Sequence, residues 1–387
     1  MPGIEDKSTG KEERDNGDSR VRQFPCSNCG GSLLFHPGAT SLKCPYCGTE
    51  NTIALNLRES SYLKENDFLA AMEEEEKKSG ETAPSADSVS CRGCGAVVSL
   101  GNQRSSDCCP YCGNPLSTQN RNSFRLNVQA VLPFAVDSEK ALTAYREWIA
   151  TRWFAPNDFR LRATRSETMN GLYMPYWTYD ARTNTRYSGQ RGDAYYETRM
   201  VMVEHNGKRG LEPRQIRKIR WTRVSGEVEI FFDDILIPAS KSLPEHLQNK
   251  LEPWNLDKLL PFKEEFLAGF VTESYQVGIK DGFKAAQLRV GPEIGEAVRR
   301  DIGGDEQRIE SSDTSYSNVT YKHILLPVWL SAYAYGGSIY RFMINAQTGE
   351  AIGDRPWSVW KIAFAVLAAG AAVAALGYYL INSGGAI

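Results

Sequence analysis

Two stretches of the chain, CSNCGGSLLFHPGATSLKCPYC at residues 26–47 and CRGCGAVVSLGNQRSSDCCPYC at residues 91–112, decide the fold of its N-terminal part. Each stretch holds two Cys-x2-Cys pairs separated by fourteen residues, and each ends in Cys-Pro-Tyr-Cys followed by glycine. The shared spacing is an internal repeat. Paired Cys-x2-Cys motifs are typical of a zinc ribbon, in which a hairpin brings both pairs to one ion.

The predicted ligands are all thiolates, four for each of two structural Zn²⁺ ions per chain. Four thiolates fill a tetrahedral coordination sphere and leave no position for a catalytic water. A glycine follows the second cysteine of every pair and can adopt positive φ there, which closes the turn at little steric cost. Iron in a rubredoxin-like site and redox disulfides are the alternatives. The ligands are Cys26, Cys29, Cys44, Cys47, Cys91, Cys94, Cys109 and Cys112.

One cysteine is left over, because Cys108 precedes the predicted ligand Cys109 directly. It is either a spare reduced thiol or a substitute for Cys109 after a one-residue slip. No apolar run lies near the N-terminus, so we expect no secretory signal peptide. A chain that stays in the reducing cytosol keeps its thiols free for metal binding.

The C-terminal region contains twenty residues without a charge, Ile362–Ile381. At 1.5 Å per residue, such a helix is about 30 Å long, the thickness of a bilayer core. Positive-inside logic, applied to Arg355 and Lys361, predicts a single-pass anchor in the inner membrane with the preceding domains in the cytoplasm. Lys361 is expected to extend to the lipid headgroups, and a buried core helix is the alternative. Aromatic residues flank the run as in an interfacial belt, at Trp357, Trp360, Tyr378 and Tyr379.

The length and composition of the chain limit the number of domains and the class of function. With 387 residues, 41% of them hydrophobic, there is room for two or three folded units. The net charge of −2 differs from the basic balance of most nucleic-acid-binding domains. The predicted organisation is disordered residues 1–22, zinc ribbon 23–55, acidic helical linker 56–90, zinc ribbon 91–121, α+β domain 122–356 and transmembrane anchor 357–387. The linker helix is either a solvated spacer or a docking helix for a partner.

Alternating and periodic patterns predict a mixed α+β domain. We expect a strand over Phe124–Phe134, a helix over 139–153 capped by Ser138, and strands over Tyr195–Glu204 and Ile216–Ile237 with a tight turn favoured at Asn206-Gly207. A helix over Lys280–Ile302 should break at Gly291-Pro292. Leu325–Tyr335 and Ser338–Asn345 flank Gly336-Gly337 as a hairpin. The similar segments Met174–Trp177 and Leu326–Trp329 suggest a duplicated α+β unit.

A basic segment begins after the predicted strand Tyr195–Glu204 and continues into the predicted strand Ile216–Ile237, and three interpretations compete for it. Its charges protect a solvated sheet edge, contact anionic lipid or an acidic partner, or bind a nucleic-acid backbone. Its only acidic residue is Glu212, and Trp221 lies within it. The segment comprises Lys208, Arg209, Arg214, Arg217, Lys218, Arg220 and Arg223.

No catalytic motif stands out, so we expect neither an enzyme nor a small-molecule substrate. A nucleotide-binding pattern G-x4-G-K-[ST] is absent from the sequence, and so are HExxH and any serine–histidine–aspartate arrangement. Asp233 and Asp234 are adjacent carboxylates, which fits a turn better than a catalytic pair.

The chain resembles bacterial membrane-anchored double zinc-ribbon proteins that are often labelled primosomal protein N′ (replication factor Y) or superfamily II helicase. Besides the ribbons, the resemblance lies in LYMPYWTYDA at 172–181, WTRVSGEVEIFFDDILIPAS at 221–240, LEPWNLDKLLPF at 251–262, and the segment at 323–362 that begins HILLPVW.

The resemblance implies a function at the membrane. Members of this family look like partners of phage-shock protein A and SPFH-type membrane-stress systems. The resemblance therefore favours a membrane-anchored adaptor or scaffold that docks protein partners in the envelope-stress response. The alternative is a nucleic-acid-binding, replication-linked protein that lacks the helicase motor.

Overall fold

The computed structural model of the protein describes residues 24–54, 65–78, 86–99, 108–114, 116, 121–124, 128–159, 169–205 and 208–383. The predicted disordered segment 1–22 lies outside these residues, and so does the first part of the predicted helical linker, 56–64. The linker helix itself, α2, begins at Phe68.

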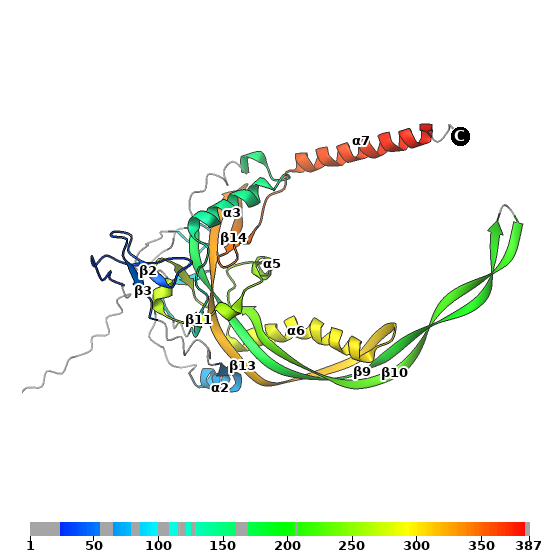
Figure 1. Ribbon diagram of the computed structural model, residues 1–387, viewed down its shortest axis with the longest axis horizontal. Coiled ribbons are helices and arrows are strands. Elements are labelled where there is room, and N and C mark those ends of the chain that lie inside the picture. Colours follow the sequence, from blue (N-terminus) through cyan, green and yellow to red (C-terminus); the bar gives the residue numbers. More distant parts are fainter. Residues whose placement is uncertain are drawn as a thin grey trace, which may run out of the picture.

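The chain forms an α+β structure with one long C-terminal helix (Figure 1). Its helices are α2 (Phe68–Lys78), α3 (Ser138–Ala150), α5 (Glu245–Gln248), α6 (Ile279–Ile302) and α7 (Val359–Ser383), with the 3-10 helices η1 (Asn249–Leu251), η2 (Leu256–Lys258) and η3 (Glu264–Leu267). Its short strands are β1 (Leu34–Phe35), β2 (Ser41–Lys43), β3 (Glu50–Thr52), β4 (Asn66–Asp67), β5 (Ala86–Ser90), β6 (Val97–Ser99), β7 (Arg121–Phe124), β8 (Ala130–Val131), β11 (Leu260–Pro261), β12 (Val271–Glu273) and β15 (Ala351–Gly353). The longer strands are β9 (Asn170–His205), β10 (Lys208–Pro238), β13 (Glu306–Tyr335) and β14 (Ser338–Asn345).

Two sheets organise the molecule. The first cysteine module, Cys26–Cys47, contains β1 and β2 and forms a separate three-stranded sheet of order β1-β2-β3 with the following strand. The second cysteine module, Cys91–Cys112, belongs to the large sheet, whose main path is β11-β8-β13-β9-β12-β6-β5-β7. Its strand β6 pairs with β12 through Glu273 and Val98. The second module is therefore part of the central sheet, whereas the first packs beside it.

The most extended feature is the hairpin of β9 and β10, which is much longer than the two strands predicted (Figure 1). His205 pairs with Lys208, and the predicted turn residues Asn206-Gly207 lie outside the described residues. Strand β13 supports β9 only as far as Gly192, which pairs with Glu306. Beyond that point, residues 193–205 and 208–220 form a two-stranded projection, which we call the arm.

The predicted repeat corresponds to two segments with the same order of elements, β8–α3–β9–β10 and β12–α6–β13–β14. Their similar sequences face each other, because Met174 on β9 pairs with Leu326 on β13. The Trp177 indole donates a 2.8 Å hydrogen bond to the carbonyl of Val277 just before α6. The Trp329 indole donates an equal bond to the carbonyl of Val136 just before α3. The arrangement has an approximate twofold relation, and its origin by duplication stays a prediction.

Three local predictions are wrong in detail. The predicted strand 124–134 is not continuous: β7 ends at Phe124 and β8 covers only Ala130–Val131. Asp137 rather than Ser138 caps α3, because its carboxylate accepts the Lys140 N–H at 2.8 Å.

Helix α6 also continues through Pro292 instead of breaking there. Pro292 lies on the exposed side of α6, where water can satisfy the Leu288 carbonyl that loses its helical partner. The opposite side buries Val290 and Ile294 against the sheet and holds the helix together. By contrast, the predicted hairpin at Gly336-Gly337 is confirmed, with Tyr335 paired to Ser338.

Candidate metal centres

The four Cys-x2-Cys turns share one backbone geometry. In each turn, the N–H of the glycine that follows the second cysteine donates to the carbonyl of the first cysteine, at 2.8–3.0 Å. That glycine has φ between 71° and 76° in every case, as predicted, a conformation that favours glycine. The four glycines are Gly30, Gly48, Gly95 and Gly113.

The turns bring eight sulfurs into two groups of four, Cys26, Cys29, Cys44 and Cys47, and Cys91, Cys94, Cys109 and Cys112. Within each group, the sulfurs lie within 4.8 Å of one another. The sulfurs of Cys26 and Cys47 are 3.6 Å apart and those of Cys94 and Cys109 also 3.6 Å, far longer than the roughly 2.05 Å of a disulfide. Four sulfurs at about 2.3 Å from a central ion lie about 3.8 Å apart. The groups therefore fit one tetrahedral metal ion each.

Within the first module, the thiolate form that a metal requires is favoured at Cys47 and Cys26. Although the Gly31 N–H opposes the shift, the neighbouring sulfurs of Cys44 and Cys47 raise the pKa of Cys29 to about 12. The hydroxyl of Thr49 and its backbone N–H lower the pKa of Cys47 to about 6. The pKa of Cys26 is also lowered, chiefly by the backbone N–H of Cys29 and then by that of Asn28. Aligned N–H groups at a thiolate stabilise its negative charge. Cys108 is exposed and belongs to neither group, whereas Cys109 is buried within the second.

The two sulfur groups differ in their surroundings despite identical spacing. The second group is packed into the core of the large sheet with Ala96, Val98 and Leu172. In the first group, Cys29 and Cys47 are exposed. The tyrosines of the two Cys-Pro-Tyr-Cys motifs diverge in the same way, because Tyr111 is fully buried and Tyr46 is 78% exposed.

A buried carboxylate holds the second module to the domain. The Tyr111 hydroxyl donates to Glu273 on β12, and the hydroxyls of Ser240 and Ser242 donate to the other carboxylate oxygen. Complete burial raises the pKa of Glu273 to about 7, although these hydrogen bonds oppose the shift. The Arg341 guanidinium also donates to the carbonyl of Tyr111 at 3.0 Å. Sequence reasoning missed this network, since its members lie far apart in the chain.

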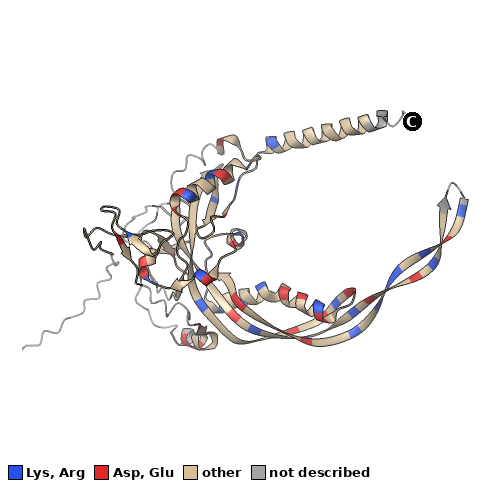
Figure 2. Cartoon of the chain, viewed as in Figure 1, with Lys and Arg blue, Asp and Glu red and all other residues tan. Residues whose placement is uncertain are grey.

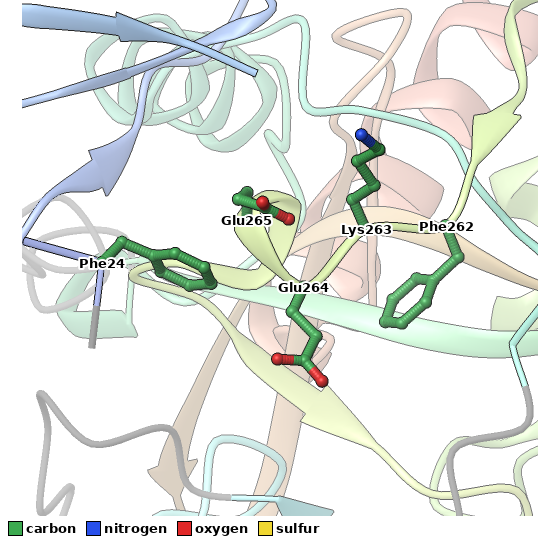
Figure 3. A pocket seen from close by; sticks show the side chains of 5 residues that line it. All are labelled: Phe24, Phe262, Lys263, Glu264 and Glu265. Carbon is green, nitrogen blue, oxygen red and sulfur yellow. The ribbon is translucent and has the colours of Figure 1, made fainter. Parts of the chain in front are cut away.

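The first module is held by its hairpin rather than by its cysteine turns. Phe35 packs on Phe266 with ring centroids 5.5 Å apart, and the Phe35 N–H donates to the carbonyl of Ala268. A hollow of about 300 Å³ lies beside this contact, lined by Phe24, Phe262, Lys263, Glu264 and Glu265. Figure 3 shows the charged side chains of the hollow pointing in different directions. They do not converge on a common point, as groups that bind one ligand would.

A second charged cluster ties the linker between the modules to the long strands. Oxygens of Asp180, Asp233 and Asp234 lie within 4.8 Å of one another. Lys322 forms ion pairs with Asp234 at 2.9 Å and with Glu65 at 3.2 Å, so the chain supplies the balancing cation itself. Burial and the neighbouring Glu65 raise the pKa of Asp180 to about 7. Asp233 and Asp234 lie at a bulge of β10, and the positive φ of Asp234 agrees with the predicted turn-like pairing.

Helix α7 is long and apolar enough to span a membrane, with a 21-residue stretch, Val359–Tyr379, that the rest of the chain does not cover. Its only charged residue, Lys361, lies in its first turn. Figure 2 shows a positive charge only near the start of α7 and no acidic residue along it. The position of Lys361 differs from the one expected. Its ammonium group donates to the carbonyls of Trp153 and Ala155, at 3.0 and 2.8 Å, rather than extending away from the body.

The chain is similar to the uncharacterized protein YdjG of Bacillus subtilis (strain 168). The two are 26% identical over 368 residues, which cover 94% of this chain and 99% of the relative. No protein-family model matches the chain, and no solved structure matches it. The likeness thus extends over nearly the whole of both proteins.

Proposed function

We propose that the protein is a non-enzymatic, membrane-anchored adaptor that presents a docking arm to protein partners at the cytoplasmic face of the inner membrane. In this account α7 crosses the bilayer, and each sulfur group holds one structural zinc ion. Closed four-thiolate sites supply folding energy rather than chemistry. The observation that carries the docking role is the apolar face of the arm.

The arm has two unlike faces. Paired residues of antiparallel strands lie on the same face, so Met202 shares a face with its partner Leu211, and Met200 with Pro213. The side chains of Met200, Met202 and Leu211 are each 59–62% exposed. An apolar patch of this kind on a projecting, unsupported ribbon marks an interaction site, and methionine adapts to varied partner surfaces.

The other face of the arm is charged. Arg199 lies opposite Arg214 in the strand register of this face. Glu197 forms ion pairs with both Arg199 and Lys218. The two faces together, residues 193–220, contain seven basic and four acidic residues, a net charge of +3, with Arg209 and Arg217 on the methionine face. The partner that fits the arm therefore has an apolar patch bordered by acidic groups.

A nucleic-acid role has less support from the same residues. Arg217 forms an ion pair with Glu306 at 2.9 Å, and Arg220 stacks on the ring of Tyr195. Trp221 is likewise covered by Arg308, whose guanidinium carbon lies 3.9 Å from the ring centroid. These cations and this aromatic ring already have partners within the fold. They are the groups that would otherwise bind the phosphates of a nucleic acid and stack on its bases. The replication-linked alternative predicts salt-sensitive DNA binding.

Site-specific photocrosslinking tests the docking role. A photoreactive phenylalanine analogue replaces Met202 in the full-length chain in living cells, and a matched variant carries it at the exposed Arg214 on the opposite face. We expect a discrete protein adduct from position 202 and little from position 214. The resemblance makes phage-shock protein A and SPFH-type proteins the first candidates for that adduct.

A second variant shows whether the contact matters for binding. Met200→Ser with Met202→Ser should abolish co-purification of the crosslinked partner from detergent extracts, while Arg214→Ser should keep most of it. Equal adducts from both faces, or adducts with nucleic acid alone, would overturn the adaptor proposal. The two methionines lie on an exposed ribbon, so the fold itself should tolerate the change.

A further inference from the structure

The start of α7 is fastened to a loop that lies some two hundred residues earlier in the chain. The Ser358 N–H donates to the carbonyl of Phe154 at 2.8 Å. The Lys361 ammonium donates to the carbonyl of Trp153 at 3.0 Å, to that of Ala155 at 2.8 Å, and to the side-chain oxygen of Asn157 at 2.7 Å. All three N–H groups of Lys361 are thus used to hold the loop that follows α3.

Exposed indoles gather at this junction. The side chains of Trp153, Trp357 and Trp360 are 72%, 57% and 87% exposed. Tryptophan is seldom this exposed in a soluble domain, because its large ring is costly to leave in water. Its apolar body and polar N–H suit the boundary between lipid and water, where it is enriched.

A cation accompanies the indoles. The Arg355 guanidinium carbon lies 4.2 Å from the ring centroid of Trp357, which places positive charge next to the aromatic surface. The rings of Phe154 and Trp357 are also neighbours, with centroids 6.4 Å apart. Figure 1 shows α7 leaving the body beside α3. The hydrogen bonds of Ser358 and Lys361 hold the loop that follows α3 against the start of α7.

We infer that Trp153, Arg355, Trp357 and Trp360 form a membrane-contacting collar, which lies at the lipid headgroups around the point where α7 enters the bilayer. The inference rests on the proposed anchoring by α7 and extends it to a residue far from α7 in sequence, Trp153. The continuity of the collar with the apolar surface of α7 identifies lipid as its occupant. Lys361 then acts as a clamp that fixes the body against the bilayer rather than as a headgroup ligand.

A depth measurement tests the collar in the full chain. An environment-sensitive fluorophore is attached to Trp153→Cys in a Cys108→Ser background, with zinc kept bound to protect the other thiols. The chain is reconstituted in nanodiscs that contain anionic lipid, one chain per disc. Lipids with a nitroxide near the headgroup then quench probes that lie at the interface. Lys140→Cys, at the other end of α3, serves as the aqueous control, and Leu376→Cys serves as the membrane control.

We expect quenching at position 153 at least threefold stronger than at position 140. If the probe at 376 is quenched and that at 153 behaves like 140, the anchor holds and the collar is refuted. If the probe at 376 is not quenched either, the anchoring and the collar both fail. Lys361→Met should lower quenching at 153 toward the level at 140 and leave 376 unchanged. Unaltered zinc content would show that this variant is folded.

Discussion

The hydroxyl of Tyr111, inside the second Cys-Pro-Tyr-Cys motif, donates a hydrogen bond to the fully buried carboxylate of Glu273. The same motif in the first module leaves Tyr46 in solvent. The tyrosine of the Cys-Pro-Tyr-Cys motif thus has two roles in this chain. It holds the second module to the domain by a buried hydrogen bond, whereas in the first module it is part of the exposed surface.

The two tyrosines provide a matched pair of variants. Tyr111→Phe removes a donor from a buried carboxylate and should lower the free energy of unfolding by about 1–3 kcal/mol. Tyr46→Phe changes only an exposed hydroxyl, and should shift it by less than about 0.5 kcal/mol. Denaturant titration in detergent, followed by fluorescence, compares them. Similar losses in both variants would contradict the assigned contact.

The stability of the domain should fall as the pH rises from 6 to 8. Glu273 has a pKa of about 7 in the folded chain, above roughly 4.3 in an unfolded one, so the folded state retains a proton that the unfolded state has lost. The stabilisation from this group is complete below about pH 4 and is lost as the pH passes 7. Between pH 6 and 8, the loss from this carboxyl is about 1–1.5 kcal/mol.

Glu273→Gln isolates this contribution, because glutamine does not titrate. The difference in unfolding free energy between wild type and variant should shrink with pH, with zinc kept saturating so that thiol protonation does not interfere. A pH-independent difference would show that Glu273 titrates outside this range.

Loss of one metal ligand should have unequal effects in the two modules. Cys44→Ser and Cys109→Ser should each reduce bound zinc from two ions to one per chain, measured by elemental analysis. Cys44 and Cys109 are both buried, but the first group also contains the exposed Cys29 and Cys47, whereas no cysteine of the second group is exposed. Cys109→Ser should therefore lower the melting temperature more than Cys44→Ser. Neither change should release the chain from the membrane. A larger effect of Cys44→Ser on melting would contradict this assignment of the cores.

The glycines of α6 test the packing of that helix on β9. A Cβ at Gly282 would collide with the Tyr179 hydroxyl and lie 3.0 Å from Cδ1 of Trp177, whereas a Cβ at Gly291 meets nothing within 4 Å. We expect Gly282→Ala to destabilise the domain by about 1–3 kcal/mol. Gly291→Ala should shift the free energy of unfolding by less than about 0.5 kcal/mol, because the gain in helix propensity is opposed by the clash of a new Cβ with the ring of Pro292. Thermal melts of both variants test this difference. Stabilisation by both substitutions would refute the close contact of Gly282 with Tyr179 and Trp177.

Short-range features of the molecule could be predicted from the sequence. The Cys-x2-Cys spacing identified both sulfur groups, and Gly336-Gly337 marked its hairpin, because each depends on neighbouring residues alone. The apolar run of α7 likewise predicted a long apolar helix from neighbouring residues alone. These signals are local, so no knowledge of the fold was needed to interpret them.

Long-range pairing could not be predicted in the same way. The polarity pattern of the middle of β9 does not reveal which of its faces is buried, because Thr183 and Thr185 are polar but buried. Their hydroxyls bond to the Ile230 carbonyl and to Thr314, which satisfies them inside the sheet. The predicted break in α6 is also wrong for a long-range reason. The helix continues through Pro292 because burial of its opposite side stabilises it by more than the loss of one hydrogen bond destabilises it. The partners of Glu273 and Lys322 come from distant parts of the chain and have no sequence signature.

The most direct measurement of the central claim is the zinc content of full-length chain extracted from washed membranes. If two sulfur groups are held at a bilayer by α7, carbonate washing should leave the chain in the membrane fraction, and the purified chain should contain two zinc ions. A chain that washes off with the soluble proteins, or that carries no bound metal, would contradict the account.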